Sequence, residues 1–301
     1  MSAQGNVARW DRVTVCFGTH RALDGASFAV PVGGVTALLG RNGAGKTTAI
    51  RTLLGLLAPT RGSVEVLGHD ALAVPPALRA RIGYVGEGHP LPRWMKVKDV
   101  VAYQASGFPT FDRAQCTRWL ERFDVPRTRR VMQLSRGMRA QLALAVALAP
   151  RPDFVVMDDP ALGLDTVARR EFLEVMIDLI QEEGRTLLLT SHVLTDVERV
   201  ADRVVLLDRG VVRVDAPLDD VRRLVRRYEL VHAGVPPETL EPITGLVRAR
   251  RRQGRWTVTV RGEEAAVVAA VRATGAEVAG VEPLSLEDVF VEYTTREEVP
   301  S

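Results

Sequence analysis

The chain has 301 residues, of which 46% are hydrophobic, so it is long enough to bury the core of one large domain or of two smaller ones. Its formal net charge of +3 is small, which gives no reason to expect nucleic acid as a partner, and we expect none. Cys16 and Cys116 have no metal-ligand spacing and build no disulfide framework, which favours a reducing, cytoplasmic compartment.

The longest uncharged apolar stretch, residues 142–149, is far shorter than the roughly 20 residues that cross a bilayer as a helix. A role at a membrane would therefore require another chain that holds this one there. Short β-runs separated by turn residues are predicted first along the chain, at 13–17 and 26–30. The apolar run 35–39 then predicts a buried strand, and residues 48–57 continue with helical periodicity.

Between that strand and that helix, residues 40–48 read Gly-Arg-Asn-Gly-Ala-Gly-Lys-Thr-Thr and match the phosphate-binding pattern G-x-x-x-x-G-K-S/T. The glycines allow a tight turn in which several N–H groups converge on one anion. Lys46 would bring its charge to the β- and γ-phosphates, and the Thr47 hydroxyl would bind Mg²⁺. The predicted phosphate-binding residues are Gly40, Asn42, Gly43, Ala44, Gly45, Lys46, Thr47 and Thr48.

The elements that follow alternate between strands and helices, which predicts an α/β fold with a parallel sheet and phosphates at the carboxyl edge of its strands. A helical block at about 90–145 is inserted between two of these strands. The predicted strands are 63–68, 81–85, 153–159, 186–189, 204–207 and 211–214. The predicted helices are 75–81, 98–105, 113–123, 136–148, 168–183 and 193–201.

The strand at 153–159 ends in two acids. An apolar run followed by an acid has the form of a Walker B strand, whose aspartate holds Mg²⁺, and a phosphate loop requires such a partner. We therefore assign Asp158 to the metal. Asp159 stands before Pro160, where an acid can also cap a helix, so its role is open on this evidence alone.

With these two elements in place, the chain resembles the ATP-binding cassette (ABC) ATPases over about residues 7–217. Five further elements match in the family's order. Phe17 stands where the family has an adenine-stacking aromatic, and Glu87 stands where it has the Q-loop glutamine. Leu134-Ser135-Arg136-Gly137-Met138 is similar to the family signature, and the stretch from Asp159 to Asp165 is similar to the acid–proline pair and the D-loop. Thr190-Ser191-His192 stands where the family has the switch histidine.

The resemblance implies a P-loop NTPase ABC cassette, with a RecA-like parallel sheet, an N-terminal antiparallel β-subdomain and an inserted helical subdomain. Two such domains dimerise head to tail around ATP, so that Ser135, Arg136, Gly137 and Met138 would face the partner's nucleotide. His192 would contact the γ-phosphate in cis, and Asp159 would orient or deprotonate the attacking water. Glu87 would lie near the Mg²⁺ held by Thr47 and Asp158.

Three places depart from the commonest family form. Asp159 stands where a glutamate is usual and reaches about 1.5 Å less far, and small misplacements of a catalytic group are costly in rate. Glu87 replaces glutamine and adds negative charge near the phosphates. Arg136 and Met138 replace a glycine and a glutamine of the signature. The chain is therefore either a slow ATPase, which the intact motifs favour, or a weakly active, regulatory half of a heterodimer.

A single cassette without coiled-coil insertions or cysteine clusters favours the separate ATP-binding subunit of a transporter. Residues 22–28, 67–70 and the tail are most similar to bacterial ABC-2-type exporters and their antibiotic-resistance relatives. The partners would be an integral-membrane permease and a second ATP-binding subunit, and the chain would lie on the inner face of the cell membrane.

Leu91, Trp94 and Met95 are candidates for permease contact, with burial in the core as the alternative. The competing class, a soluble ABC ATPase acting on nucleic acid or ribosomes, is disfavoured by the low charge.

Residues 218–301 predict a small α+β accessory or dimerisation domain, with the ABC domain ending at 217. Its predicted elements are a basic helix at 219–227, a strand at 256–260, a helix at 263–273, a strand at 277–281 and a helix at 286–293. Four histidines have no place in a motif, and we expect them at the surface: His20, His69, His89 and His232.

Overall fold

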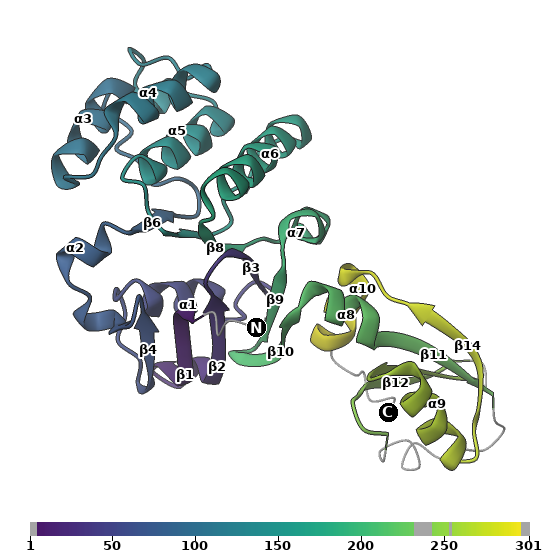
Figure 1. Cartoon of the computed structure of the whole chain (residues 1–301). Coiled ribbons are helices and arrows are strands. Elements are labelled where there is room, and N and C mark those ends of the chain that lie inside the picture. The colour runs from purple at the N-terminus through teal and green to yellow at the C-terminus, as the bar shows by residue number, and fades with distance from the viewer. Residues whose placement is uncertain (1–4, 232–242, 253–254, 296–301) are drawn as a thin grey trace. The chain divides into compact units, whose positions relative to one another are not determined.

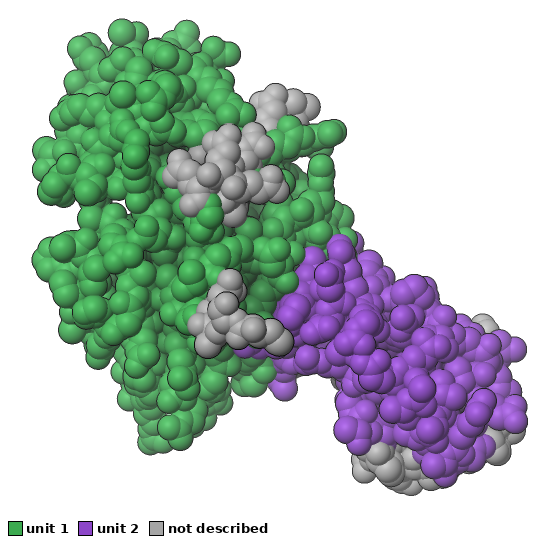
Figure 2. Space-filling view, viewed as in Figure 1, with its two compact units in different colours: residues 1–212 green, residues 213–301 purple. Residues whose placement is uncertain are grey.

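The computed structural model describes residues 5–231, 243–252 and 255–295. The chain forms two compact units, residues 1–212 and 213–301, which Figure 2 shows in separate colours. The boundary falls inside strand β10 (Val211–Pro217), a few residues before the predicted end of the first domain.

The first unit contains two sheets (Figure 1). The antiparallel sheet has the order β2-β1-β4-β5, and its strands are β1 (Asn6–Phe17), β2 (His20–Pro31), β4 (Arg61–Val66) and β5 (His69–Asp70). The second has the order β10-β9-β3-β8-β7-β6, with β3 (Gly34–Leu39), β6 (Ile82–Val85), β7 (Phe154–Met157), β8 (Thr186–Thr190) and β9 (Arg203–Asp208). From β9 to β6 every neighbouring pair is parallel, so the predicted parallel core and the antiparallel β-subdomain are both confirmed.

Seven α-helices belong to the described part of this unit, together with two short 3₁₀ turns at Ala71–Ala73 and Val131–Gln133. Four of them are α1 (Lys46–Leu53), α2 (Pro76–Arg79), α6 (Thr166–Glu183) and α7 (Leu194–Val200). The other three lie between β6 and β7 in sequence and group together in Figure 1, as the predicted helical insertion requires: α3 (Val97–Gly107), α4 (Arg113–Arg122) and α5 (Arg136–Leu148). In the described part of the chain, no helix is both long and apolar enough to cross a membrane.

Trp10 joins the antiparallel sheet to helix α1. Its side chain is 1% exposed and stacks on Phe28 with ring centroids 4.1 Å apart. The indole Nε1–H donates to the Ala49 carbonyl at 3.3 Å and to Thr52 Oγ1 at 3.1 Å. Because a buried indole N–H needs a partner, these contacts fix the helix that follows the phosphate loop against the sheet.

The second unit contains one antiparallel sheet with the order β12-β13-β11-β14. The strands are β11 (Val225–Val231), β12 (Leu246–Arg252), β13 (Arg255–Arg261) and β14 (Glu277–Pro283), and the helices are α8 (Leu218–Leu224), α9 (Glu264–Ala273) and α10 (Leu286–Thr294). Tyr228, Leu230 and Val258 from the sheet pack with Val267 and Val271 of α9 in a buried core.

The predicted basic helix at 219–227 is wrong beyond Leu224, because β11 begins at Val225. Residues alternate there between buried and exposed positions, and Tyr228 and Leu230 are 0% and 1% exposed. Arg226 pairs with Glu264 of α9, whereas Arg227 bonds to Glu292 of α10. Arginine spacing alone suggested a helix, but burial of alternate apolar residues decides for a strand.

Candidate functional site

The loop of residues 40–48 leads from β3 directly into α1, as predicted. Gly45 precedes the helix with φ of 109°, a conformation that side chains other than hydrogen strongly disfavour. A Cβ atom there would also lie 2.4 Å from the Ala22 carbonyl oxygen of β2. Only glycine therefore allows the loop to lie this close to β2.

Lys46 lies over this loop. Its Nζ donates to the carbonyl of Gly40 at 2.7 Å and to that of Arg41 at 3.3 Å. Burial lowers the pKa of Lys46, while the nearby carboxylates of Asp159, Asp158 and Glu87 act in the opposite direction. Three acids from two separate segments thus lie close enough to the lysine to affect its charge, so the structure brings these predicted site residues together.

Asp158 and Asp159 are held by one threonine. The Thr190 hydroxyl donates to Asp158 Oδ1 at 2.8 Å and accepts from the backbone N–H of Asp159, also at 2.8 Å. Thr190 ends β8 and is 0% exposed, while the two acids follow β7, its neighbour in the sheet. A single buried hydroxyl therefore connects the carboxyl ends of two parallel strands.

The donor atoms at this edge fit a magnesium ion. Asp158 is 3% exposed, and its Oδ2 is buried with no hydrogen-bond partner among the described residues. An unpaired buried carboxylate oxygen is costly unless a cation or a donor meets it. Thr47 lies half-buried in the first turn of α1, and hydroxyl and carboxylate oxygens are the hard donors that Mg²⁺ prefers. Glu87 is exposed and close enough to act on Lys46.

His192 meets Asp159 directly. Its Nδ1 lies 2.8 Å and 3.0 Å from the two carboxylate oxygens of Asp159. Because a carboxylate accepts, Nδ1 carries the hydrogen in this contact. Asp159 has φ of 47°, a left-handed conformation that aspartate tolerates better than most residues. Its carboxylate faces the histidine instead of capping a helix, whereas its role in hydrolysis stays a prediction.

Phe17 lies at the end of β1 with 51% of its surface exposed, so it is not a core residue. It pairs with His20 at the start of β2, and two residues later Ala22 lies against the loop at Gly45. The exposed ring is therefore carried by the hairpin that borders the loop, as stacking on an adenine requires.

The signature-like segment begins α5. Ser135 is its N-cap, with Oγ accepting from the Met138 N–H at 3.1 Å, and both Ser135 and Arg136 are exposed. A Cβ at Gly163 would lie 3.0 Å from Nη1 of Arg136, so this side chain packs against the D-loop stretch. Asp165 Oδ1 accepts from the Ala168 N–H at 2.9 Å and thus caps the following helix.

The sequence did not predict the contacts that two residues of this region make. Thr190 belongs to no ligand pattern, although its place directly before Ser191 and His192 at a strand end was a signal. His89 was expected at the surface, which is wrong: it is 6% exposed, its Nε2 lies 2.9 Å from the Pro160 carbonyl oxygen, and burial lowers its pKa. His20 and His69 are exposed as expected, and His232 lies outside the described residues.

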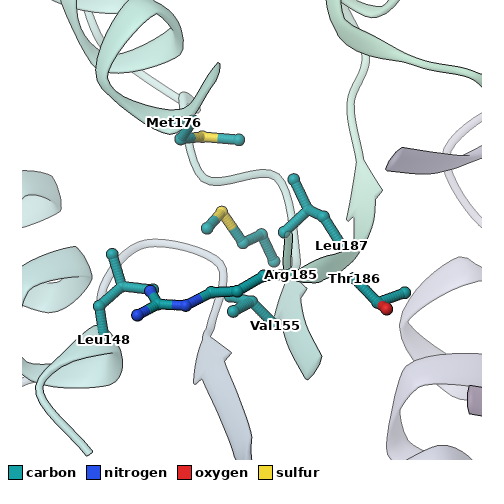
Figure 3. A pocket seen from close by; sticks show the side chains of 7 residues that line it. Leu148, Val155, Met176, Arg185, Thr186 and Leu187 are labelled. Atoms are coloured by element: carbon teal, nitrogen blue, oxygen red, sulfur yellow. The ribbon is translucent and has the colours of Figure 1, made fainter. Parts of the chain in front are cut away.

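A small apolar cavity lies along β7 and at the amino-terminal end of β8 (Figure 3). Its volume of about 10 Å³ leaves room for roughly one water molecule, so it holds no substrate. It is lined by Leu148, Val155, Met157, Met176, Arg185, Thr186 and Leu187.

Four features together define an ATP-binding cassette: a phosphate-binding loop, a strand followed by two aspartates, a histidine that follows the neighbouring strand, and a helical insertion. Residues 23–162 match the profile of the ABC transporter family. The chain is 34% identical to the daunorubicin resistance ATP-binding protein DrrA3 of Streptomyces coeruleorubidus, with 92% of both chains covered. It therefore belongs to the ATP-binding proteins of ABC transporters, whose cassettes bind and hydrolyse ATP.

Two further similarities agree with this assignment. The Nod factor export ATP-binding protein I of Paraburkholderia xenovorans is 35% identical over 67% of each chain. A solved structure of an ATP-binding subunit of an ABC transporter superposes with a TM-score of 0.65 and 28% identity, and covers 72% of this chain and 92% of its own.

A methyl group at position 45 tests the geometry of the loop. We expect Gly45→Ala to raise the Kd for ATP by at least about tenfold, because strain and the contact with Ala22 together exceed 1.4 kcal/mol. A fluorescent ATP analogue and competition with ATP measure this. Gly68→Ala is the matched control, since Gly68 has φ of 76° but open space around the missing Cβ. Equal affinities in the two variants would contradict the described loop.

Proposed function

We propose that this chain is the ATP-hydrolysing subunit of an exporter, and that it works as one of a pair on the inner face of the membrane beside a separate permease. The observation that carries the proposal is the Asp158–Asp159–Thr190–His192 cluster facing Lys46. The exporter assignment is supported by the names of the two curated relatives, one a drug-resistance protein and the other an export protein.

In this account the loop N–H groups and Lys46 hold the phosphates of ATP. Asp159 accepts a proton from the attacking water, and His192 holds the carboxylate of Asp159 in place through its Nδ1–H. Nε2 donates to the γ-phosphate only when the ring is doubly protonated, because a neutral imidazole carries a single N–H. Asp158 and Thr47 would hold Mg²⁺, with Glu87 nearby, and the bound ion neutralises charge on the phosphate oxygens. Phe17 stacks on the adenine.

The second subunit completes the site. Ser135, Arg136 and the Gly137 N–H stand at the start of α5, where exposed donors and the positive helix end suit a phosphate. We assign these residues, with Met138 behind them, to the ATP of the partner. D-loop residue Asp165 caps the next helix, and we assign it to the interface between the two subunits.

Hydrolysis is expected to be slow. The side chain of Asp159 is one methylene shorter than that of the usual glutamate, and it is held against His192. Glu87 adds a third carboxylate to a site that must accept a highly charged nucleotide. Both features weaken positioning and charge neutralisation without removing either the general base or the phosphate-binding residues.

The permease would dock beside β6. A cavity of about 260 Å³ there is formed by β6, α3, α5 and the loop that follows β6. Leu91, one of the predicted contact residues, lines it, and Trp94 of the same loop is 72% exposed. An exposed tryptophan three residues along the chain from a leucine that lines a cavity is typical of a protein interface. Met95 is half-buried and contributes less surface.

Phosphate release tests the ATPase proposal. We expect the wild-type chain to release phosphate from ATP with Mg²⁺ at least about tenfold faster than Lys46→Ala, because this variant loses the cation that stabilises the transferring group. Lys98→Ala is the matched control, since Lys98 is exposed on α3 and should leave the rate within about twofold of wild type. Equal rates for wild type and Lys46→Ala would contradict the proposal.

The docking proposal has a separate test. Trp94→Arg should abolish co-purification with the membrane protein that the wild-type chain retains in detergent, because a charge replaces the apolar anchor. ATP affinity should stay unchanged. Leu72→Arg is the control, since Leu72 is 47% exposed but lies on a 3₁₀ turn away from this cavity. Undiminished co-purification of Trp94→Arg would place the permease elsewhere.

A further inference from the structure

His89 lies between the cavity beside β6 and the catalytic acid. Its neighbours in sequence, Gly86, Pro90 and Leu91, line that cavity, while His89 itself is buried and is not among the lining residues. The ring Nε2 is 2.9 Å from the carbonyl oxygen of Pro160, a residue 71 positions away in the sequence. A carbonyl can only accept, so Nε2 carries the hydrogen and donates.

The backbone around His89 is arranged for this contact. The residue has φ of 54°, which is unfavourable for a histidine and persists only where surrounding contacts hold it. Its N–H donates to the Gly86 carbonyl at 3.1 Å, and its carbonyl accepts from the Leu91 N–H at 2.7 Å. The tight turn thus directs the ring toward Pro160.

Pro160 directly follows Asp159. Proline fixes its own φ, so a hydrogen bond to its carbonyl leaves the backbone on that side of Asp159 little freedom. On the other side, the Asp158 N–H donates to the Val85 carbonyl at 2.9 Å. The left-handed conformation of Asp159 is therefore held between two contacts, and both come from β6 and the loop after it.

We propose that His89 is a positioning residue for ATP hydrolysis, which holds Asp159 toward His192 through the Pro160 carbonyl. This role rests on the proposed ATPase function. The bond from His89 joins a buried ring to a backbone carbonyl next to Asp159, so we expect it to act on the rate of the chemical step and not on ATP binding.

Three variants separate positioning from packing. His89→Leu removes the hydrogen-bond donor. We expect kcat for ATP hydrolysis to fall about tenfold, which is the usual effect of a misplaced catalytic group or a lost hydrogen bond. KM should stay within about twofold of the wild-type value. In His89→Gln the amide Nε2 reaches the same carbonyl, and kcat should stay within about threefold of wild type. His69→Leu is the control, because His69 is exposed and its Nδ1 contacts only Leu67 nearby.

Two outcomes would overturn the proposal. The first is an undiminished kcat in His89→Leu. The second is an equal loss of kcat in His89→Gln and His89→Leu together with an equal loss of thermal stability, because this result indicates a packing role. A second readout is independent of activity. ¹⁵N NMR of labelled histidines in the full chain should show the His89 Nε2 protonated, and an unprotonated Nε2 would refute the hydrogen bond. Absence of hydrolysis above Lys46→Ala in the wild type would instead reject the ATPase function, with the NMR result unaffected.

Discussion

The site depends on one buried hydroxyl, that of Thr190. Parallel strands end at the same edge of a sheet, but their ends are not aligned by sheet hydrogen bonds once the strands stop. Thr190 continues the alignment by one step, because its hydroxyl donates to the Asp158 carboxylate and accepts from the Asp159 N–H. Asp158 then keeps one oxygen unpaired, and Asp159 reaches His192, which lies two residues beyond Thr190.

The second requirement is that helix α1, which begins with Lys46, has a fixed position relative to these acids. Trp10 of the antiparallel sheet fixes the position of α1 by donating hydrogen bonds to two groups of that helix. Gly45 completes the placement, because its missing side chain lets the loop touch β2. The sheet contacts and the loop thus bring Lys46 close to three carboxylates, one of which meets His192.

Much of this arrangement was predictable from residue patterns. The phosphate loop and Asp158 follow from local spacing, because strand, turn and helix chemistry at 35–57 and 154–158 is contained in those segments. Thr190 and His89 could not be found in this way, since their partners lie 31 and 71 residues away in sequence and nothing local marks a tertiary hydrogen bond. β11 was missed for a related reason: Arg226 and Arg227 dominate its sequence, whereas the buried Tyr228 decides its structure.

The central proposal is that this ATP site is half of a complete one, which Ser135 and Gly137 of a second ATP-binding subunit, or their counterparts there, would close. Light scattering of Asp159→Asn with ATP and Mg²⁺ tests this most directly, because this variant keeps the phosphate-binding residues but cannot accept the proton from water. The account predicts a mass of two chains that returns to one when Ser135→Arg is added. A variant that stays monomeric at saturating ATP would contradict it.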